Sequence, residues 1–149
     1  MELMIENIQK LRELTGAGVI ECKKALDKSN GDFDLAIKII NERGVQKAQS
    51  KSERKTGAGL LESYVHNGRI GVLLELRAET DFVVRSEPFR GLAHELAMQI
   101  SAMAPKDTTE LSGQPCIKDE SMKVEDLIKK VIAKVGENIK VERFCRYEL

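Results

Sequence analysis

The sequence predicts an α+β protein, with an N-terminal bundle of three helices followed by a three-stranded antiparallel sheet that has helices on one face. Apolar residues recur at helical spacing over the first 45 residues. Side chains alternate with period two over 70–77 and again over 139–148, where both faces of the strand are mixed in polarity. Helical spacing returns between these two alternating segments. With 149 residues, the chain has room for one domain or two small ones.

The first 45 residues are expected to form three short helices. Apolar side chains form a stripe over 4–14, and a second helix covers 19–28. Asp32 is a suitable cap for the start of the third helix, where Leu35 is expected in the core. Gly44 lies where a left-handed residue would end that helix. A bundle of this size is marginally stable by itself.

The polar, basic segment 46–56 is predicted to be a linker, with a solvated helical extension as the alternative, and a core domain is predicted over 57–149. The core begins with a hairpin, because strands over 60–65 and 70–77 flank an Asn67-Gly68 turn signal. Alternation along the second strand predicts one buried face, formed by Ile70, Val72, Leu74 and Leu76.

The rest of the core returns to the hairpin. A helix is predicted to start near Pro88 and to stop before Pro105. Residues 105–122 are expected to be irregular and are followed by a short helix that ends at Gly136. The last strand, 139–148, should pair with the hairpin, because a lone terminal strand has no other partner.

Composition excludes several classes of protein. Lys and Arg total 24, and Asp and Glu also total 24, so the basic excess of a nucleic-acid binder is missing. No apolar run is long enough for a membrane span. The N-terminus resembles neither a secretory signal nor a transit peptide, so we expect a cytoplasmic protein.

Candidate catalytic and metal-binding groups are few, and no metal or cofactor is expected. The sequence has no P-loop, no nucleophile-elbow motif and no zinc-protease motif, so an enzyme is not expected. We expect His66 and His94 at the surface. The three cysteines form no CxxC pair, which indicates a reducing compartment: Cys22 is expected in the core, Cys116 in a loop where it could react, and Cys145 in the last strand.

Two short segments are candidates for binding a partner. Gly16 and Gly18 permit a tight corner before Val19 and Ile20, which cannot both be fully buried in a thin bundle; the alternative is an ordinary helix–helix turn with both in the core. Residues 79–84 follow the strongest strand. They form either a structural corner with Phe82 in the core or an exposed acidic and aromatic docking element.

Several blocks of sequence together resemble the bacterial elongation factor Ts family. They are LRELTGAG at 11–18, ECKKAL at 21–26, NGD at 30–32, ETDFV at 79–83, and GENI at 136–139 followed by Arg143. The blocks occur in the order typical of the family and cover most of the chain. Only about forty residues separate the first core helix from the last helix and strand, so the chain resembles the short class with a single core subdomain.

The resemblance implies a guanine-nucleotide exchange factor that acts on elongation factor Tu in translation elongation. It implies a ubiquitin-associated-like bundle that contacts the GTPase around Arg12, Val19, Ile20 and Lys23. It further implies that the Thr80, Asp81, Phe82 and Val83 motif inserts beside the magnesium-binding region of the GTPase and promotes GDP release.

Assembly and an alternative function complete the expectations. The short class implies a homodimer, and Leu73 on the second face of the sheet should also be covered, with Cys145 near its symmetry mate. The alternative is an adaptor that binds a peptide or a helix through the bundle and has no exchange activity. It explains residues 1–45 but leaves the motif at 80–83 without a role.

Overall fold

The computed structural model describes all 149 residues and divides into two compact units, Met1–Lys47 and Ala48–Leu149. The predicted α+β fold is confirmed: helices precede a three-stranded antiparallel sheet that packs against further helices.

The first unit is built from α1 (Glu2–Thr15), α2 (Val19–Lys28) and the larger part of α3 (Phe33–Ser50). Asp32 caps α3 as expected, since its Oδ1 accepts a hydrogen bond from the backbone N–H of Leu35 at 3.1 Å. The small aliphatic core consists of Leu11, Cys22, Ala25, Leu26, Ala36 and Ile40.

Two expectations about the bundle are wrong. Gly44 does not end α3, which continues to Ser50 because the next residues are good helix formers and Ala48 is buried in the core of the second unit. The apolar stripes are also less buried than their spacing indicates. Leu35 is 44% exposed and Leu14 is 64% exposed, because three short helices have too few faces to cover every apolar side chain.

The second unit contains one sheet, with β1 (Ala58–His66), β2 (Ile70–Ala78) and β3 (Ile139–Glu148) in the order β1-β2-β3. Both strand pairs are antiparallel, as predicted. Asn67 and Gly68 turn the hairpin with φ of 52° and 66°. Val72, Leu74 and Leu76 share the buried face, whereas Ile70 at the turn end is only partly covered.

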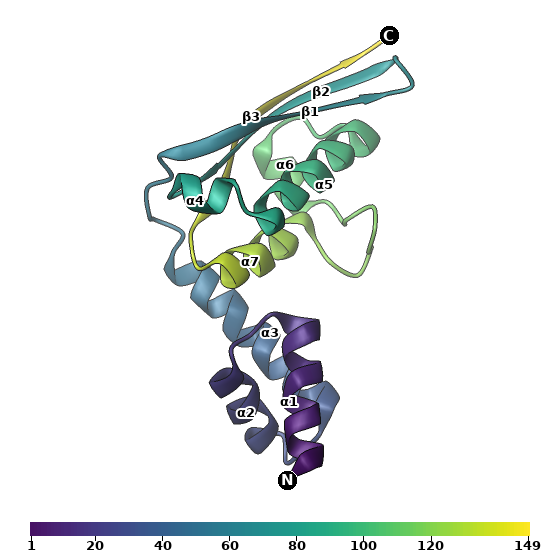
Figure 1. Cartoon of the computed structure of the whole chain (residues 1–149). Helices are drawn as coiled ribbons and strands as arrows, with labels where there is room; N and C mark the ends of the chain where they lie inside the picture. The colour runs from purple at the N-terminus through teal and green to yellow at the C-terminus, as the bar shows by residue number, and fades with distance from the viewer. The chain divides into compact units, whose positions relative to one another are not determined.

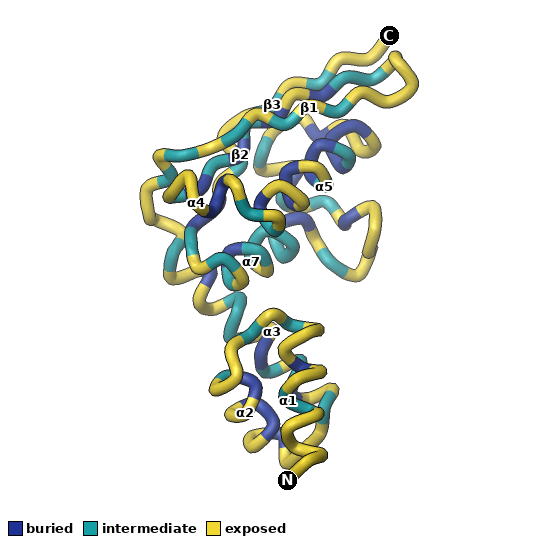
Figure 2. The backbone as a smooth tube through the Cα atoms, in the orientation of Figure 1, coloured by how far each residue is buried: buried dark blue, intermediate teal, exposed yellow.

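Helices cover a single face of this sheet (Figure 1). α5 (Glu87–Met103) lies against β1 and β2, and α7 (Val124–Val135) packs on α5. α5 is the most deeply buried helix of this unit (Figure 2). α6 (Thr108–Gly113) is a short helix within the segment expected to be irregular, and Asp107 caps it by accepting from Glu110 N–H at 2.8 Å.

Candidate functional site

The Thr80–Val83 segment, here called the knuckle, follows β2 and forms most of the one-turn helix α4 (Asp81–Val84). Thr80 is the N-cap residue, and its Oγ1 accepts from Val83 N–H at 3.4 Å. Val83 and Val84 are 4% and 8% exposed and anchor the turn in the core. The turn is therefore attached to the core by one side only.

The other side of the knuckle faces solvent. Phe82 is 85% exposed, and Asp81 beside it is also exposed. Phe82, Arg85 and Ser86 line a shallow hollow next to the turn. Because an exposed phenylalanine leaves a large apolar area in water, its placement at a rigid tip is typical of a contact with a partner protein.

Two residues next to the knuckle, Glu137 and Asn138, were not singled out as site residues from the sequence. Thr80 donates to both carboxylate oxygens of Glu137, from its N–H at 2.9 Å and from its Oγ1 at 2.7 Å. In return, Asn138 N–H donates to Glu79 Oε1 at 2.9 Å. The resemblance already marked Glu137 and Asn138 as part of a family motif, but only the tertiary structure brings them to the knuckle.

The corner between α1 and α2 depends on one of its two glycines. Gly16 adopts φ 71°, and its N–H closes α1 on Arg12 C=O at 2.8 Å. Thr15 Oγ1 donates to Leu11 C=O at 2.6 Å and accepts from Ala17 N–H at 3.2 Å. Gly18 has φ −68° and does not require the left-handed region.

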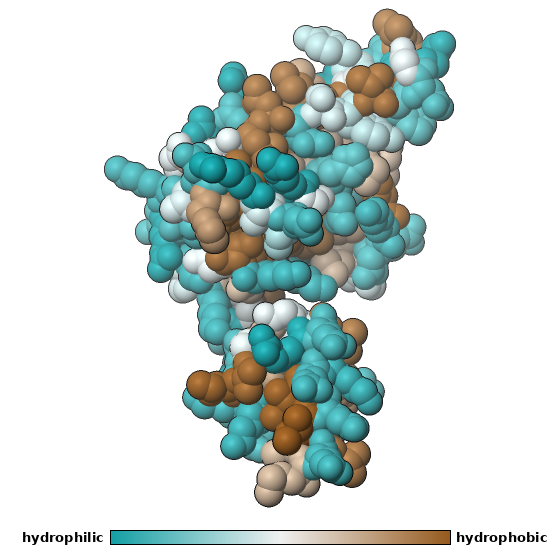
Figure 3. Space-filling view, in the orientation of Figure 1, coloured by the Kyte–Doolittle hydropathy of each residue, from teal (hydrophilic) through white to brown (hydrophobic).

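Both apolar residues after the corner are exposed, Val19 by 49% and Ile20 by 71%. Arg12 and Lys23 are also exposed, so all four predicted contact residues are accessible. Figure 3 shows apolar atoms at the start of α2. An open groove beside them is lined by Gly18, Val19, Ile20, Glu21, Lys24, Arg43 and Lys47.

The groove adds cations that the sequence did not single out. Lys24 belongs to α2, whereas Arg43 and Lys47 come from α3, so only the packing of α3 against α2 brings them together. Lys47 Nζ lies 2.9 Å from Glu21 Oε1. The groove therefore combines an apolar edge with a basic wall.

The sheet face opposite the helices, here called the open face, has an apolar part. The strand register puts Leu73 beside Cys145 and Tyr147 beside Gly71. Leu61 is 63% exposed, Leu73 43% and Tyr147 76%. These side chains leave a band of apolar surface in water.

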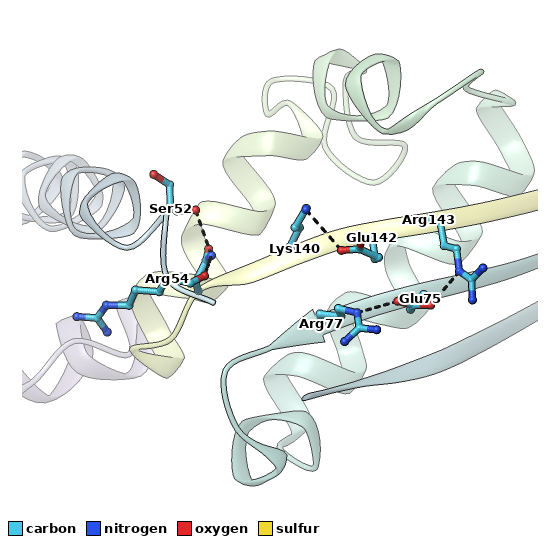
Figure 4. A network of polar contacts seen from close by, with 8 residues as sticks. Ser52, Arg54, Glu75, Arg77, Lys140, Glu142 and Arg143 are labelled. Atoms are coloured by element: carbon cyan, nitrogen blue, oxygen red, sulfur yellow. Dashed lines mark hydrogen bonds and ion pairs between the residues drawn. The ribbon is translucent and has the colours of Figure 1, made fainter. Parts of the chain in front are cut away.

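The same face also carries charges. Glu75 accepts from Arg77 Nε at 2.7 Å and from Arg143 Nε at 2.9 Å, and Figure 4 shows the carboxylate between the two guanidinium groups. These hydrogen bonds, first from Arg77 and then from Arg143, hold the pKa of Glu75 below its ordinary value. The open face is therefore partly apolar and partly ionic.

The other candidate reactive groups offer no catalytic centre. Cys116 is buried, and burial raises the pKa of its thiol, which corrects the expectation that it could react from a loop. Cys22 is buried as expected, and Cys145 is exposed. His94 lies at the surface, 3.4 Å from Glu62.

Neither a metal site nor a membrane-spanning helix is present. No group of three or more His, Cys, Asp or Glu side chains is arranged to hold a metal ion. No helix combines the length and the apolar character that a membrane crossing requires.

Comparisons with known proteins give a consistent result. The family model described as "Elongation factor TS" matches residues 79–149, which include the knuckle and Glu137. Elongation factor Ts of Thermotoga maritima is 41% identical over 193 aligned positions, covering all of this chain and 97% of that protein. The Thermotoga neapolitana protein is 42% identical, with 98% of it covered. The alignments are longer than this chain of 149 residues, so these relatives carry segments that it lacks.

Proposed function

The chain belongs to the elongation factor Ts family, the nucleotide exchange factors of elongation factor Tu, and from that membership we propose that it releases GDP from elongation factor Tu through the knuckle. Members of the family are not enzymes. Exchange requires no covalent step, only a partner whose binding lowers the affinity of the GTPase for its nucleotide.

The observation that carries the proposal is the position of Phe82. It is 85% exposed, whereas the next residue, Val83, is 4% exposed. The phenyl ring therefore stands in water on a turn that is fixed to the core. A large side chain held in this way can enter a partner without first unfolding anything in its own protein.

In the proposed mechanism, Phe82 inserts between helices of the GTPase next to its magnesium-binding region. The insertion shifts the groups that hold the ion, and Asp81 binds polar groups of the GTPase. Because Mg²⁺ bridges protein and phosphate oxygens, loosening it removes much of the affinity for GDP. By linkage, GDP must weaken binding of this chain by the same factor.

The test is the rate of labelled GDP release from elongation factor Tu. The wild-type chain is expected to accelerate release, and Phe82→Ala to lose most of that acceleration, about 100-fold for an aromatic hot spot. The thermal midpoint should change little, because Phe82 contributes almost no buried area. Release by Phe82→Ala at the wild-type rate would show that the knuckle is only a structural corner.

We infer that the corner provides the second contact with the GTPase. Val19 and Ile20 supply apolar area, and Arg12 and Lys23 supply a polar rim. The basic wall of the groove favours an acidic segment of the partner beside this apolar edge.

We also infer a homodimer that buries the open face. A two-fold contact presents the same surface on both chains, so Leu61, Leu73 and Tyr147 would be covered twice. Cys145, next to Leu73, would approach its symmetry mate. As a translation factor, the dimer would act in the cytoplasm.

A further inference from the structure

We propose that Glu137 is a positioning residue for exchange: its carboxylate holds Thr80 by two hydrogen bonds and thereby sets the direction in which the Phe82 side chain projects into solvent. The inference rests on the proposed role of Phe82. It adds a residue that lies 57 positions away from the knuckle in the sequence.

Both the N–H and the hydroxyl group of the cap residue Thr80 form hydrogen bonds. Thr80 N–H donates to Glu137 Oε1 at 2.9 Å, and Thr80 Oγ1 donates to Glu137 Oε2 at 2.7 Å. A hydroxyl has a single hydrogen, so its donation to Glu137 turns an oxygen lone pair toward Val83 N–H, 3.4 Å away. One carboxylate thus fixes both the backbone of Thr80 and the orientation of its cap.

The knuckle needs such a restraint because α4 is only four residues long. A single helical turn has an unfavourable nucleus and is not stable without tertiary support. Val83 and Val84 provide apolar anchoring, but apolar packing has no directional preference. Hydrogen bonds to a charged acceptor are both directional and stronger than neutral ones, and here they act on the residue that starts the turn.

Glu137 is itself held in place. Gly136 ends α7 in the left-handed conformation, with φ 77°, and directs the chain back toward β3. The next residue, Asn138, is 6% exposed and donates its N–H to Glu79 Oε1 at 2.9 Å. The two segments are therefore joined by two carboxylates: Glu79 accepts from Asn138, and Glu137 accepts from Thr80.

The side chain of Asn138 adds further support. Its Nδ2 donates to the backbone C=O of Ser52 at 3.3 Å and of Arg54 at 2.9 Å, the two residues labelled beside the network in Figure 4. Arg54 Nη1 in turn lies 3.6 Å from Glu79 Oε1. Glu137 thus projects from a braced segment, which makes it a stable reference point for Thr80.

Glu137 lies outside the apolar core, so its loss need not unfold the protein. Neither Glu137 nor Thr80 is buried. Glu137→Ala removes the two bonds to Thr80, whereas Val83 and Val84 keep their packing. The expected effect is a knuckle that samples several directions, with Phe82 oriented correctly for only part of the time.

The experiment compares Glu137→Ala, Phe82→Ala and the double variant. Backbone amide exchange at Thr80 and Val83 reports the knuckle in the free chain, and release of labelled GDP from elongation factor Tu reports function. Glu95→Ala is the matched control, because Glu95 on α5 is also a partly exposed carboxylate with a polar partner: its Oε1 lies 3.3 Å from Lys118 Nζ. Thermal midpoints of all variants check the fold.

In Glu137→Ala, we expect amide exchange at Thr80 to become about tenfold faster or more, as for a lost hydrogen bond to a charged group. Release of GDP should become slower by about the same factor. Glu137→Gln keeps one acceptor oxygen for Thr80 N–H and should restore part of the protection. The double variant should be no slower in GDP release than Phe82→Ala alone, because Glu137 acts through Phe82. Glu95→Ala should match the wild type.

Unchanged protection of the Thr80 amide in Glu137→Ala would overturn the inference. A double variant markedly slower than Phe82→Ala would also overturn it, since Glu137 would then act by another route. If Phe82→Ala alone releases GDP at the wild-type rate, the proposed function fails instead, and amide protection at Thr80 still tests the hold of Glu137 separately.

Discussion

Replacing Ile20 with alanine separates binding from folding at the corner. Ile20 is 71% exposed in the free chain, so truncation removes few contacts within the bundle. Complete burial of an isoleucine side chain is worth about 1.5–3 kcal/mol. If the GTPase covers the exposed part, Ile20→Ala should cost about 1–2 kcal/mol of binding free energy, or about 5–30-fold in Kd.

The measurement is calorimetric titration of nucleotide-free elongation factor Tu with each variant, together with thermal unfolding of the variants alone. The free energy of unfolding should change by less than about 0.5 kcal/mol for Ile20→Ala. Leu11→Ala is the core reference, because Leu11 is 0% exposed, and it should lose about 2–5 kcal/mol of stability. Leu35, apolar at a core-like spacing, is unsuitable for this purpose because it is 44% exposed.

Ile5→Ala provides the matched control. Ile5 is also an isoleucine of the bundle and is 53% exposed, but it lies near the start of α1 and not at the corner. Its truncation should leave Kd unchanged. The reasoning fails if Ile5→Ala and Ile20→Ala weaken binding equally, or if Ile20→Ala destabilises the chain as much as Leu11→Ala does.

Two further predictions concern the open face. Leu73→Arg should shift the sedimenting species from twice the 16.7 kDa chain mass to a single chain, because it puts a charge into each half of the apolar contact. Leu14→Arg, at a 64% exposed position of the bundle, should leave the dimer intact. A wild-type chain that sediments only as a monomer would reject the contact. Glu75 has a lowered pKa in the folded chain, so its contribution to stability is present above its unfolded pKa of about 4.3 and is lost as pH falls through the folded value. The thermal midpoint of the wild type should therefore fall more steeply on acidification below about pH 4 than that of Glu75→Gln, and parallel curves would mean that Arg77 and Arg143 do not stabilise the carboxylate.

Local backbone structure could be predicted from the sequence because its determinants are local. Alternation over 70–77 and the Asn67-Gly68 signal predict the hairpin, and both depend on residues only a few positions apart. The corner followed from the same kind of evidence, since Gly16 adopts the positive φ that its position indicated. The exception is Gly44, where a burial partner for Ala48 outside the bundle extends α3 beyond the local stop signal.

Burial and long-range polar contacts were decided by the tertiary structure. Phe82 and Val83 are adjacent and both apolar, yet one is in water and the other in the core, because only packing of α4 on the sheet determines which side of the turn is covered. The cations Arg43 and Lys47 reach the groove only when α3 packs on α2. Thr80 contacts Glu137 because β2 and β3 pair in antiparallel fashion, which brings the end of β2 beside the start of β3. No local pattern encodes a contact across 57 residues.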